Sequence, residues 1–278
     1  VPAGALQGAQ AFAVVAGIGV AGALLRLLLA VAGVALGGGA VTALSAHAGS
    51  ICAALALSFL GVLHVFRGRG ADRAAVPGLY AYFARYLLAF AAYSVLMNAD
   101  VILVKHYFSP TEAGLFARAA MVGRIIIFLP QPIAMAMFPK VVSGGETSAG
   151  SRRTLIKAIG LVALIIVAVA VFCTLLPGLA LRVLAGESTP ELIPVVRAMA
   201  WGLCPLSITF VLMNFELAQR RFRITWPLLL CAVAYIGAVA AWHGSYLQVV
   251  AALIGASALS LVLSLLCLPW NGAEKKEA

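Results

Sequence analysis

Charged residues are scarce in this sequence. Only 10% of its 278 residues are Asp, Glu, Lys or Arg, whereas 64% are apolar, and the mean hydropathy is +1.08. Soluble domains contain about a quarter charged and about half apolar residues, because they need polar side chains at their surface. The composition excludes a water-soluble fold. Since the apolar runs also lack the alternation of an outer-membrane barrel, we expect an all-α, polytopic bundle of transmembrane helices.

Motifs that mark catalysis or metal binding are lacking as well. The five cysteines lie in apolar segments and form no Cys-x-x-Cys pair. The four histidines, at positions 47, 64, 106 and 243, do not have the spacing of metal ligands. The sequence has no phosphate-binding Gly loop, no nucleophile elbow and no acidic pair suited to hydrolysis. We therefore expect a protein that is not an enzyme and that binds neither a metal nor a cofactor.

What the sequence does contain is a series of eight apolar segments. Each is bounded by Gly, Pro or charged residues, and each is long enough for a transmembrane helix of about 20 residues. The predicted spans are residues 11–36, 41–66, 78–107, 111–142, 155–176, 192–218, 224–242 and 246–268.

The net charge of +10 indicates orientation rather than nucleic-acid binding. Basic residues gather in the junctions after the second, fourth, sixth and eighth spans, and cytoplasmic loops are enriched in Lys and Arg. These are Arg67, Arg69, Arg73, Lys140, Arg152, Arg153, Lys157, Arg220, Arg221, Arg223, Lys275 and Lys276. The opposite junctions contain only Lys105 and Arg182. This asymmetry predicts that both ends of the chain face the cytoplasm.

A weak internal repeat suggests how the spans are grouped. Residues 1–12 (VPAGALQGAQAF) align at an offset of 210 with residues 211–222 (VLMNFELAQRRF), and each precedes a helical hairpin. We therefore interpret 1–66 as the last two helices of one lobe, 67–77 as a cytoplasmic linker, 78–270 as a six-helix second lobe and 271–278 as a cytoplasmic tail. Such repeats are typical of transporters. Because the chain begins at Val1, we expect it to be part of a longer protein.

Residues 98–142 (NADVILVKHYFSPTEAGLFARAAMVGRIIIFLPQPIAMAMFPKVV) resemble the seventh and eighth helices of the polysaccharide flippases. These belong to the multidrug/oligosaccharidyl-lipid/polysaccharide exporter superfamily. Residues 1–12 resemble the entry to that family's fifth helix, and FELAQRRFR the junction of its tenth and eleventh helices. The resemblance implies helices five to twelve of a twelve-helix, two-lobed transporter. It also implies a substrate, a polyprenyl-pyrophosphate-linked oligosaccharide flipped across the bacterial inner membrane.

Several ionisable residues lie at membrane depth, where each costs at least about 2.5–3.5 kcal/mol and usually faces a cavity or a partner. Asp100 and Arg118 lie nine residues before and after Ser109 in a predicted hairpin, so we expect them at similar depth. They form either a structural ion pair or a titratable pair that opens on binding. Arg124 has no carboxylate at matched depth and is a candidate for binding phosphate, with hydrogen bonds to carbonyls as the alternative.

The other charged residues at membrane depth are weaker candidates for a substrate or ion site. Arg26 either lines a cavity or bonds within its lobe, and Arg85 is near enough to the cytoplasmic edge to snorkel. Glu216 forms a salt bridge beside Arg220 and Arg221 or takes part in ion coupling. The substrate-binding candidates are therefore Arg26, Arg85, Arg118 and Arg124, and the coupling or ion-pair candidates are Asp100 and Glu216.

Pro130 and Pro132 stand inside the fourth predicted span. Each proline removes a backbone donor and frees a carbonyl, which bends or breaks a helix. Lipid cannot satisfy such groups, so they face protein or water. The break is either a fixed packing kink or part of a moving wall of a transport cavity.

These observations lead to one expected function and several alternatives. We expect a flippase in the bacterial inner membrane whose partners are a lipid-linked glycan, membrane lipids and a coupling H+ or Na+. The first alternative is a cation-coupled multidrug exporter, which should carry more buried carboxylates than buried Arg. The others are a membrane-bound glycan polymerase or ligase, for which the longest outer junction, 177–191, is short, and an inactive truncated fragment.

Overall fold

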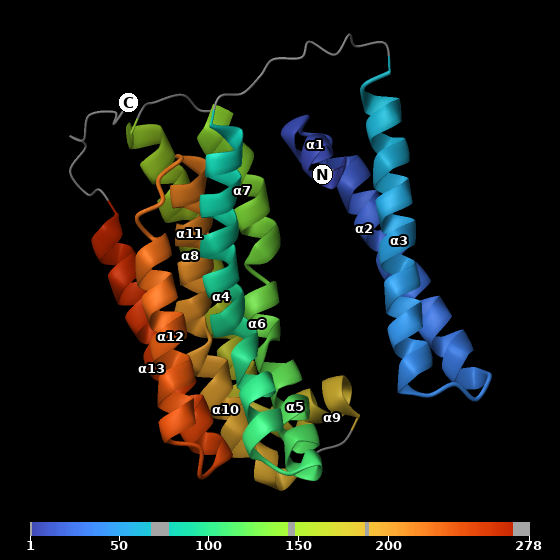
Figure 1. Cartoon of the computed structure of the whole chain (residues 1–278), viewed down its shortest axis with the longest axis vertical. Coiled ribbons are helices and arrows are strands. Elements are labelled where there is room, and N and C mark those ends of the chain that lie inside the picture. The colour runs from blue at the N-terminus through green and yellow to red at the C-terminus, as the bar shows by residue number, and fades with distance from the viewer. Residues whose placement is uncertain (1, 68–77, 144–147, 187–188, 269–278) are drawn as a thin grey trace. The chain divides into compact units, whose positions relative to one another are not determined.

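The computed structural model describes residues 2–67, 78–143, 148–186 and 189–268, and every regular element in these ranges is a helix (Figure 1). The chain divides into two units, Val1–Ala75 and Val76–Ala278. Residues 68–77 of the predicted linker and the predicted tail 271–278 lie outside the described ranges. So do four of the junction residues, Arg69, Arg73, Lys275 and Lys276.

The first unit is a helical hairpin with a short helix packed on it. It consists of α1 (Pro2–Gly8), α2 (Phe12–Ala35) and α3 (Ala40–Val65). The chain reverses at Gly37, whose φ of +83° is a left-handed conformation that glycine adopts without strain. Helix α2 has no buried residue, and α3 buries only Ala46, Ser50 and Ser58. The predicted spans 11–36 and 41–66 are confirmed, whereas α1 was not predicted.

The second unit is a helical bundle whose long helices run side by side (Figure 1). Its elements are α4 (Leu79–Tyr107), α5 (Pro110–Gly123), α6 (Ile125–Phe128), α7 (Gln131–Ser143), α8 (Ser148–Leu175), α9 (Pro177–Ala185), the 3-10 helix η1 (Pro190–Leu192), α10 (Ile193–Gly202), α11 (Cys204–Ala218), α12 (Thr225–Ala241) and α13 (Tyr246–Cys267). Helix α11 lies at the centre, since it packs against α7, α8 and α13 and every residue from 209 to 217 is buried.

The helices have the dimensions of membrane spans. In the described ranges, seven helical stretches are long and apolar enough to cross a membrane, and α12 is a shorter apolar helix. Many large apolar side chains point outward, as Leu164 and Val233 do, which suits lipid rather than water. The predicted all-α, polytopic membrane bundle is thus confirmed, and the chain is a multi-pass membrane protein.

The hairpin between α4 and α5 is fixed by local sequence. Ser109 caps α5: its hydroxyl oxygen accepts a hydrogen bond from the Glu112 amide, and Glu112 accepts one in return from the Ser109 amide. Pro110 follows as the first helical residue, where a missing N–H costs nothing. This capping box places the reversal at the turn that the sequence predicted.

Two membrane stretches of the second unit are interrupted along their length. In residues 110–143 the helix stops at Arg124 and again at Leu129 and Pro130, so the break predicted at Pro130 is present. Pro132 lies in the first turn of α7, where its missing donor breaks nothing. The second stretch, residues 193–218, is interrupted at Leu203, which was not predicted.

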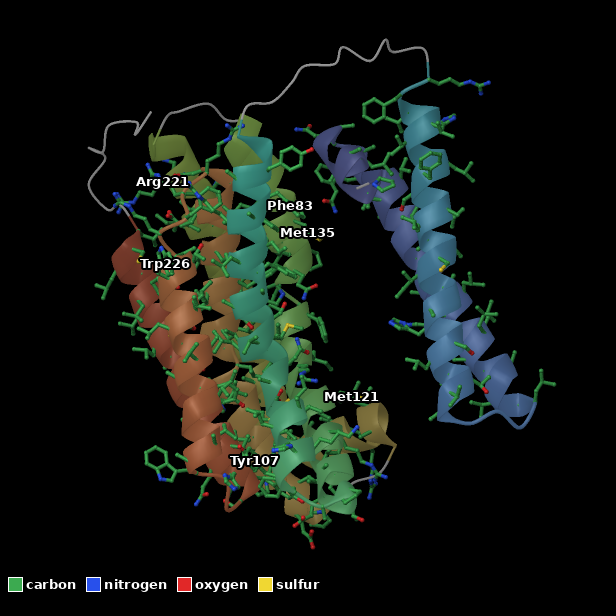
Figure 2. The ribbon with its side chains drawn as sticks, in the orientation of Figure 1. Phe83, Tyr107, Met121, Met135, Arg221 and Trp226 are labelled. Atoms are coloured by element: carbon green, nitrogen blue, oxygen red, sulfur yellow. The ribbon has the colours of Figure 1, made fainter. Side chains whose placement is uncertain are left out.

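The two ends of this bundle differ in charge. Figure 2 shows Phe83 and Arg221 toward one end and Tyr107 toward the other. The first of these is where α8 and α12 begin, and we call it the basic end. It is defined by Arg152, Arg153, Arg220, Arg221 and Arg223.

Candidate functional site

The most prominent feature of the bundle interior is an ion pair between α4 and the end of α5. The Arg124 Nη2 atom donates to the Asp100 Oδ1 atom at 2.6 Å. The Asp100 side chain is 2% exposed and that of Arg124 is 18% exposed. A short charge-assisted hydrogen bond of this kind lets two charges persist in a medium of low polarity.

This pair corrects two expectations. Asp100 is paired with Arg124 rather than with Arg118, which is exposed on α5. The prediction that Arg124 has no carboxylate partner is therefore wrong. Equal distance of two Cα atoms from the turn does not bring two side chains together, because their direction and length also decide which charged groups meet.

Several buried polar atoms in the same bundle lack partners in the described ranges. Within the described ranges, the Arg124 Nε atom and the hydroxyl groups of Tyr93 and Tyr235 are buried and have no hydrogen-bond partner. Tyr235, on α12, is close enough to Asp100 and Arg124 to sense both charges. Tyr93, on α4, packs its ring against Phe210 of α11 at 5.2 Å between centroids. The described part of the interior thus combines the Asp100–Arg124 ion pair with donors that a ligand or water could satisfy.

The two interruptions lie against each other next to this ion pair. A Cβ atom added to Gly123 would lie 2.9 Å from Cβ of Met199 and 3.5 Å from Cδ1 of Leu203. Gly123 is the last residue of α5 before Arg124, and Leu203 is the interruption between α10 and α11. The glycine therefore allows the two irregular backbones to approach closely at the level of the ion pair.

A serine from α11 satisfies the carbonyl that Pro130 frees. In a regular helix the amide of residue 130 would donate to the carbonyl of Ile126, but proline has no N–H. The Ser207 Oγ atom donates to this Ile126 oxygen at 2.9 Å, and both residues are buried. The break predicted from Pro130 is thus a built junction between two helices.

Hydroxyl groups of α13 stabilise the neighbouring interruption. Ser257 donates to the Gly202 carbonyl at 2.5 Å, and Ser260 lies 3.3 Å from the Thr209 hydroxyl. In a membrane, where helices gain little from burying apolar surface, such interhelical hydrogen bonds and small side chains hold helices together. Side-chain hydrogen bonds therefore join α13 to both α10 and α11.

The remaining candidates lie apart from the ion pair. Arg85, on α4 near the basic end, places its Cζ atom 5.5 Å from the centre of the Phe222 ring, a cation–π distance. Arg26, on α2 of the first unit, is exposed, and the structure gives it no hydrogen bond or ion pair with a described residue. The hydrogen bond within its lobe is therefore not seen in the described part of the hairpin.

Glu216 departs from the expected surface salt bridge. It is fully buried at the end of α11, and within the described ranges neither carboxyl oxygen has a hydrogen-bond partner. Arg221 and Arg223, in the turn after α11, interact with it electrostatically, but within the described ranges no ion pair joins either of them to it. Its carboxyl is enclosed by the bundle instead of reaching the basic side chains.

Sequence reasoning missed three contributors to this region. Pro205 is the second residue of α11, just after the interruption at Leu203, and the argument applied to Pro130 would have found it. Ser207 and Tyr235 carried no local signal, because their roles depend on residues 81 and more positions away.

The α4 helix is tied to the α11–α12 turn by an aromatic contact at the basic end. The Tyr82 hydroxyl donates to the Leu217 carbonyl at 3.1 Å, and its ring lies edge-on to Phe222 at 5.4 Å.

Replacing Tyr82 with Phe keeps the ring contact and removes the hydrogen bond. We expect a loss of about 0.5–1.5 kcal/mol in the free energy of unfolding, measured by thermal unfolding in detergent. Tyr80→Phe is the control, because that side chain is 90% exposed, and an equal loss there would contradict the prediction.

Comparison of the chain with protein-family models, with curated proteins and with solved structures gave no match.

Proposed function

We propose that this chain is part of a transporter that moves an anionic, lipid-linked oligosaccharide across the membrane. The observation that carries the proposal is the Asp100–Arg124 ion pair, which lies beside the points where Pro130 and Pro205 remove backbone donors from two membrane helices. Irregular backbone at membrane depth is tolerated only inside protein or beside a water-filled cavity. Arg124, Leu129 and Leu203 keep right-handed helical backbone angles, so the two helices are disturbed locally and not unwound. The freed backbone carbonyls are the feature that they share with the discontinuous helices of transporter sites.

Arg124 is the residue we assign to the anionic group of the substrate. Its side chain is 18% exposed, and its buried Nε donor has no partner within the described ranges, although Nη2 is bound to Asp100. The planar fork of Arg suits the oxygens of a phosphate. A pyrophosphate would compete with Asp100 for Arg124, so binding would loosen the contact between α4 and α5.

The resemblance of residues 98–142 to polysaccharide flippases supports the same proposal, since it covers this site. In that reading the sugar-pyrophosphate head passes through the protein while the polyprenyl tail stays in the bilayer. We also propose the bacterial inner membrane as location, with the basic end in the cytoplasm, because basic loops mark that side. Arg26, exposed on α2, is a second candidate for contact with the head group.

The test is translocation by the full-length protein in liposomes. A fluorescent polyprenyl-pyrophosphate oligosaccharide is placed in the inner leaflet, and its arrival outside is followed with an impermeant quencher. We expect Arg124→Gln to slow translocation about tenfold or more, as loss of a charged hydrogen bond of about 1.5–3 kcal/mol would. Arg124→Lys should retain part of the rate.

Arg182→Gln is the matched control, because Arg182 is an exposed arginine on α9, away from the interruptions. Gel filtration of each variant shows whether it is folded. An unchanged rate in a folded Arg124→Gln variant would refute the assignment of Arg124. Translocation of a cationic dye in place of the glycan would refute the proposed substrate class.

A further inference from the structure

Glu216 carries a buried carboxyl group that the proposed site does not use. Its side chain is 0% exposed in the last turn of α11, at the basic end of the bundle. Both oxygens lack a hydrogen-bond partner among the described residues. Asp100 offers the contrast, because that buried carboxylate is bound to Arg124 at 2.6 Å.

Among the described residues, no element packed around Glu216 gives its carboxyl group a hydrogen bond or an ion pair. On α13, Cys267 lies nearby, and on α4 the Tyr82 hydroxyl is used by the Leu217 carbonyl. In the turn after α11, Arg221 and Arg223 are near enough to act electrostatically, but the described ranges contain no ion pair with Glu216. On α8 the basic side chains Arg152, Arg153 and Lys157 are all exposed. The side chains at the end of α7, from residue 138 to 143, lie outside the described part of the chain.

A carboxyl group in this setting is far cheaper to bury as the neutral acid than as the anion. An ionised carboxylate without hydrogen bonds or a paired charge has lost its hydration and received nothing in return. The neutral acid loses much less and supplies a proton that a neighbouring oxygen can accept. Two other buried hydroxyls without partners in the described ranges, those of Thr225 and Ser264, lie at the same end of the bundle.

We propose that Glu216 is a proton-binding site, which holds a proton in this conformation and releases it when the end of α11 opens toward the basic end. On opening, the carboxyl O–H bond breaks, the proton passes to a water molecule, and the carboxylate keeps the electron pair. The carboxylate is then stabilised by water and by Arg221, whose amide already bonds to the Glu216 carbonyl at 2.9 Å. Figure 2 shows Arg221 at this end of the bundle. A role in coupling protons to transport rests on the proposed function, whereas the bound proton does not.

Infrared spectroscopy of the purified full-length protein tests the bound proton. A protonated buried carboxyl has a carbonyl stretch that is separate from the amide bands and shifts in D2O. We expect this band at neutral pH in the wild type and in Asp100→Asn, and its loss in Glu216→Gln, which is neutral and of equal size. In the wild type, labelling glutamate with carboxyl-13C should shift the band. This measurement holds even if the Glu216→Gln variant does not fold. Absence of the band in the wild type, persistence in Glu216→Gln or no isotope shift would each overturn the proposal.

The coupling role has its own readout. In the liposome assay, a pH gradient is expected to change the wild-type rate severalfold and to leave the rate of Glu216→Gln unchanged. Acceleration by a sodium gradient with no response to pH would overturn the coupling role. If the wild type moved no glycan at all, the proposed function would fail, and the infrared result would still decide whether Glu216 binds a proton.

Discussion

Replacing Asp100 with alanine is expected to lower the free energy of unfolding by about 3–5 kcal/mol. The substitution leaves the Arg124 guanidinium without its carboxylate in the bundle interior, and a buried charge that has lost its partner costs this much. Most of the loss comes from the stranded arginine rather than from the bond itself. Thermal or denaturant unfolding in detergent micelles measures it, with tryptophan fluorescence as the signal.

The double variant separates these two contributions. In Asp100→Ala/Arg124→Ala no charge is stranded, so we expect it to be more stable than Asp100→Ala alone. Glu191→Ala serves as the control, because this carboxylate is exposed in η1 and surface changes cost at most about 0.5 kcal/mol. If the double variant lost as much as the sum of both single variants, the ion pair would not be the cause.

Ser207→Ala is expected to cost about 1–3 kcal/mol, more than its small loss of volume explains. The hydroxyl group satisfies the Ile126 carbonyl, which Pro130 leaves without a backbone donor. Removing it strands a buried acceptor, and that penalty has this size. The same unfolding measurement detects the loss.

A second measurement, in a variant that lacks Pro130, tests this explanation. In a Pro130→Ala background residue 130 regains an N–H that can reach the Ile126 carbonyl, so Ser207→Ala should cost clearly less there than in the wild type. Ser264→Ala is the matched control, because this buried hydroxyl has no partner in the described ranges, and its removal should be neutral or slightly stabilising. An equal cost of Ser207→Ala in both backgrounds would mean that the serine acts only through packing.

The fold was largely predictable from the sequence because bilayer thickness and breaker residues set the ends of each span. The predicted span 41–66 agrees with α3, Ala40–Val65, and 246–268 agrees with α13, Tyr246–Cys267. Such boundaries depend on local chemistry: Gly37 permits the turn before α3, and Ser245 caps α13 through the Gln248 amide. Helices α1 and α9 were missed, since neither is long enough to show as a span.

The site was predicted less well, because contacts between helices depend on side-chain direction. In the antiparallel hairpin of α4 and α5, each side chain leans toward the start of its own helix. Asp100 therefore leans toward the basic end, and Arg124 leans away from it, so their charged groups meet although their Cα atoms lie at different depths. Arg118 has its Cα atom at the same distance from the turn as Asp100, but the leaning of the two side chains carries their charged groups apart.

The burial of Glu216 was equally beyond reach of the sequence. Its proximity to Arg220 and Arg221 along the chain suggested a surface salt bridge, but α11 is the central helix and is enclosed on several sides. The apolar character of α11 is nearly uniform around its circumference, so no stripe marks an outer face on which the carboxylate could be placed. Only the packing of α7, α8 and α13 decides which way the side chain faces.

The lengths of the two long helices of the first unit have a mechanical consequence. Helix α2 has 24 residues and α3 has 26, so at 1.5 Å per residue they extend about 36 and 39 Å. Both exceed a hydrocarbon thickness of about 30 Å, and an over-long helix adapts mainly by tilting. Because α2 and α3 pack along each other, the hairpin is expected to tilt as one body. The tilt angle of the hairpin is therefore expected to depend on membrane thickness. In thicker bilayers, such as those made of long-chain lipids, the hairpin should stand closer to the membrane normal.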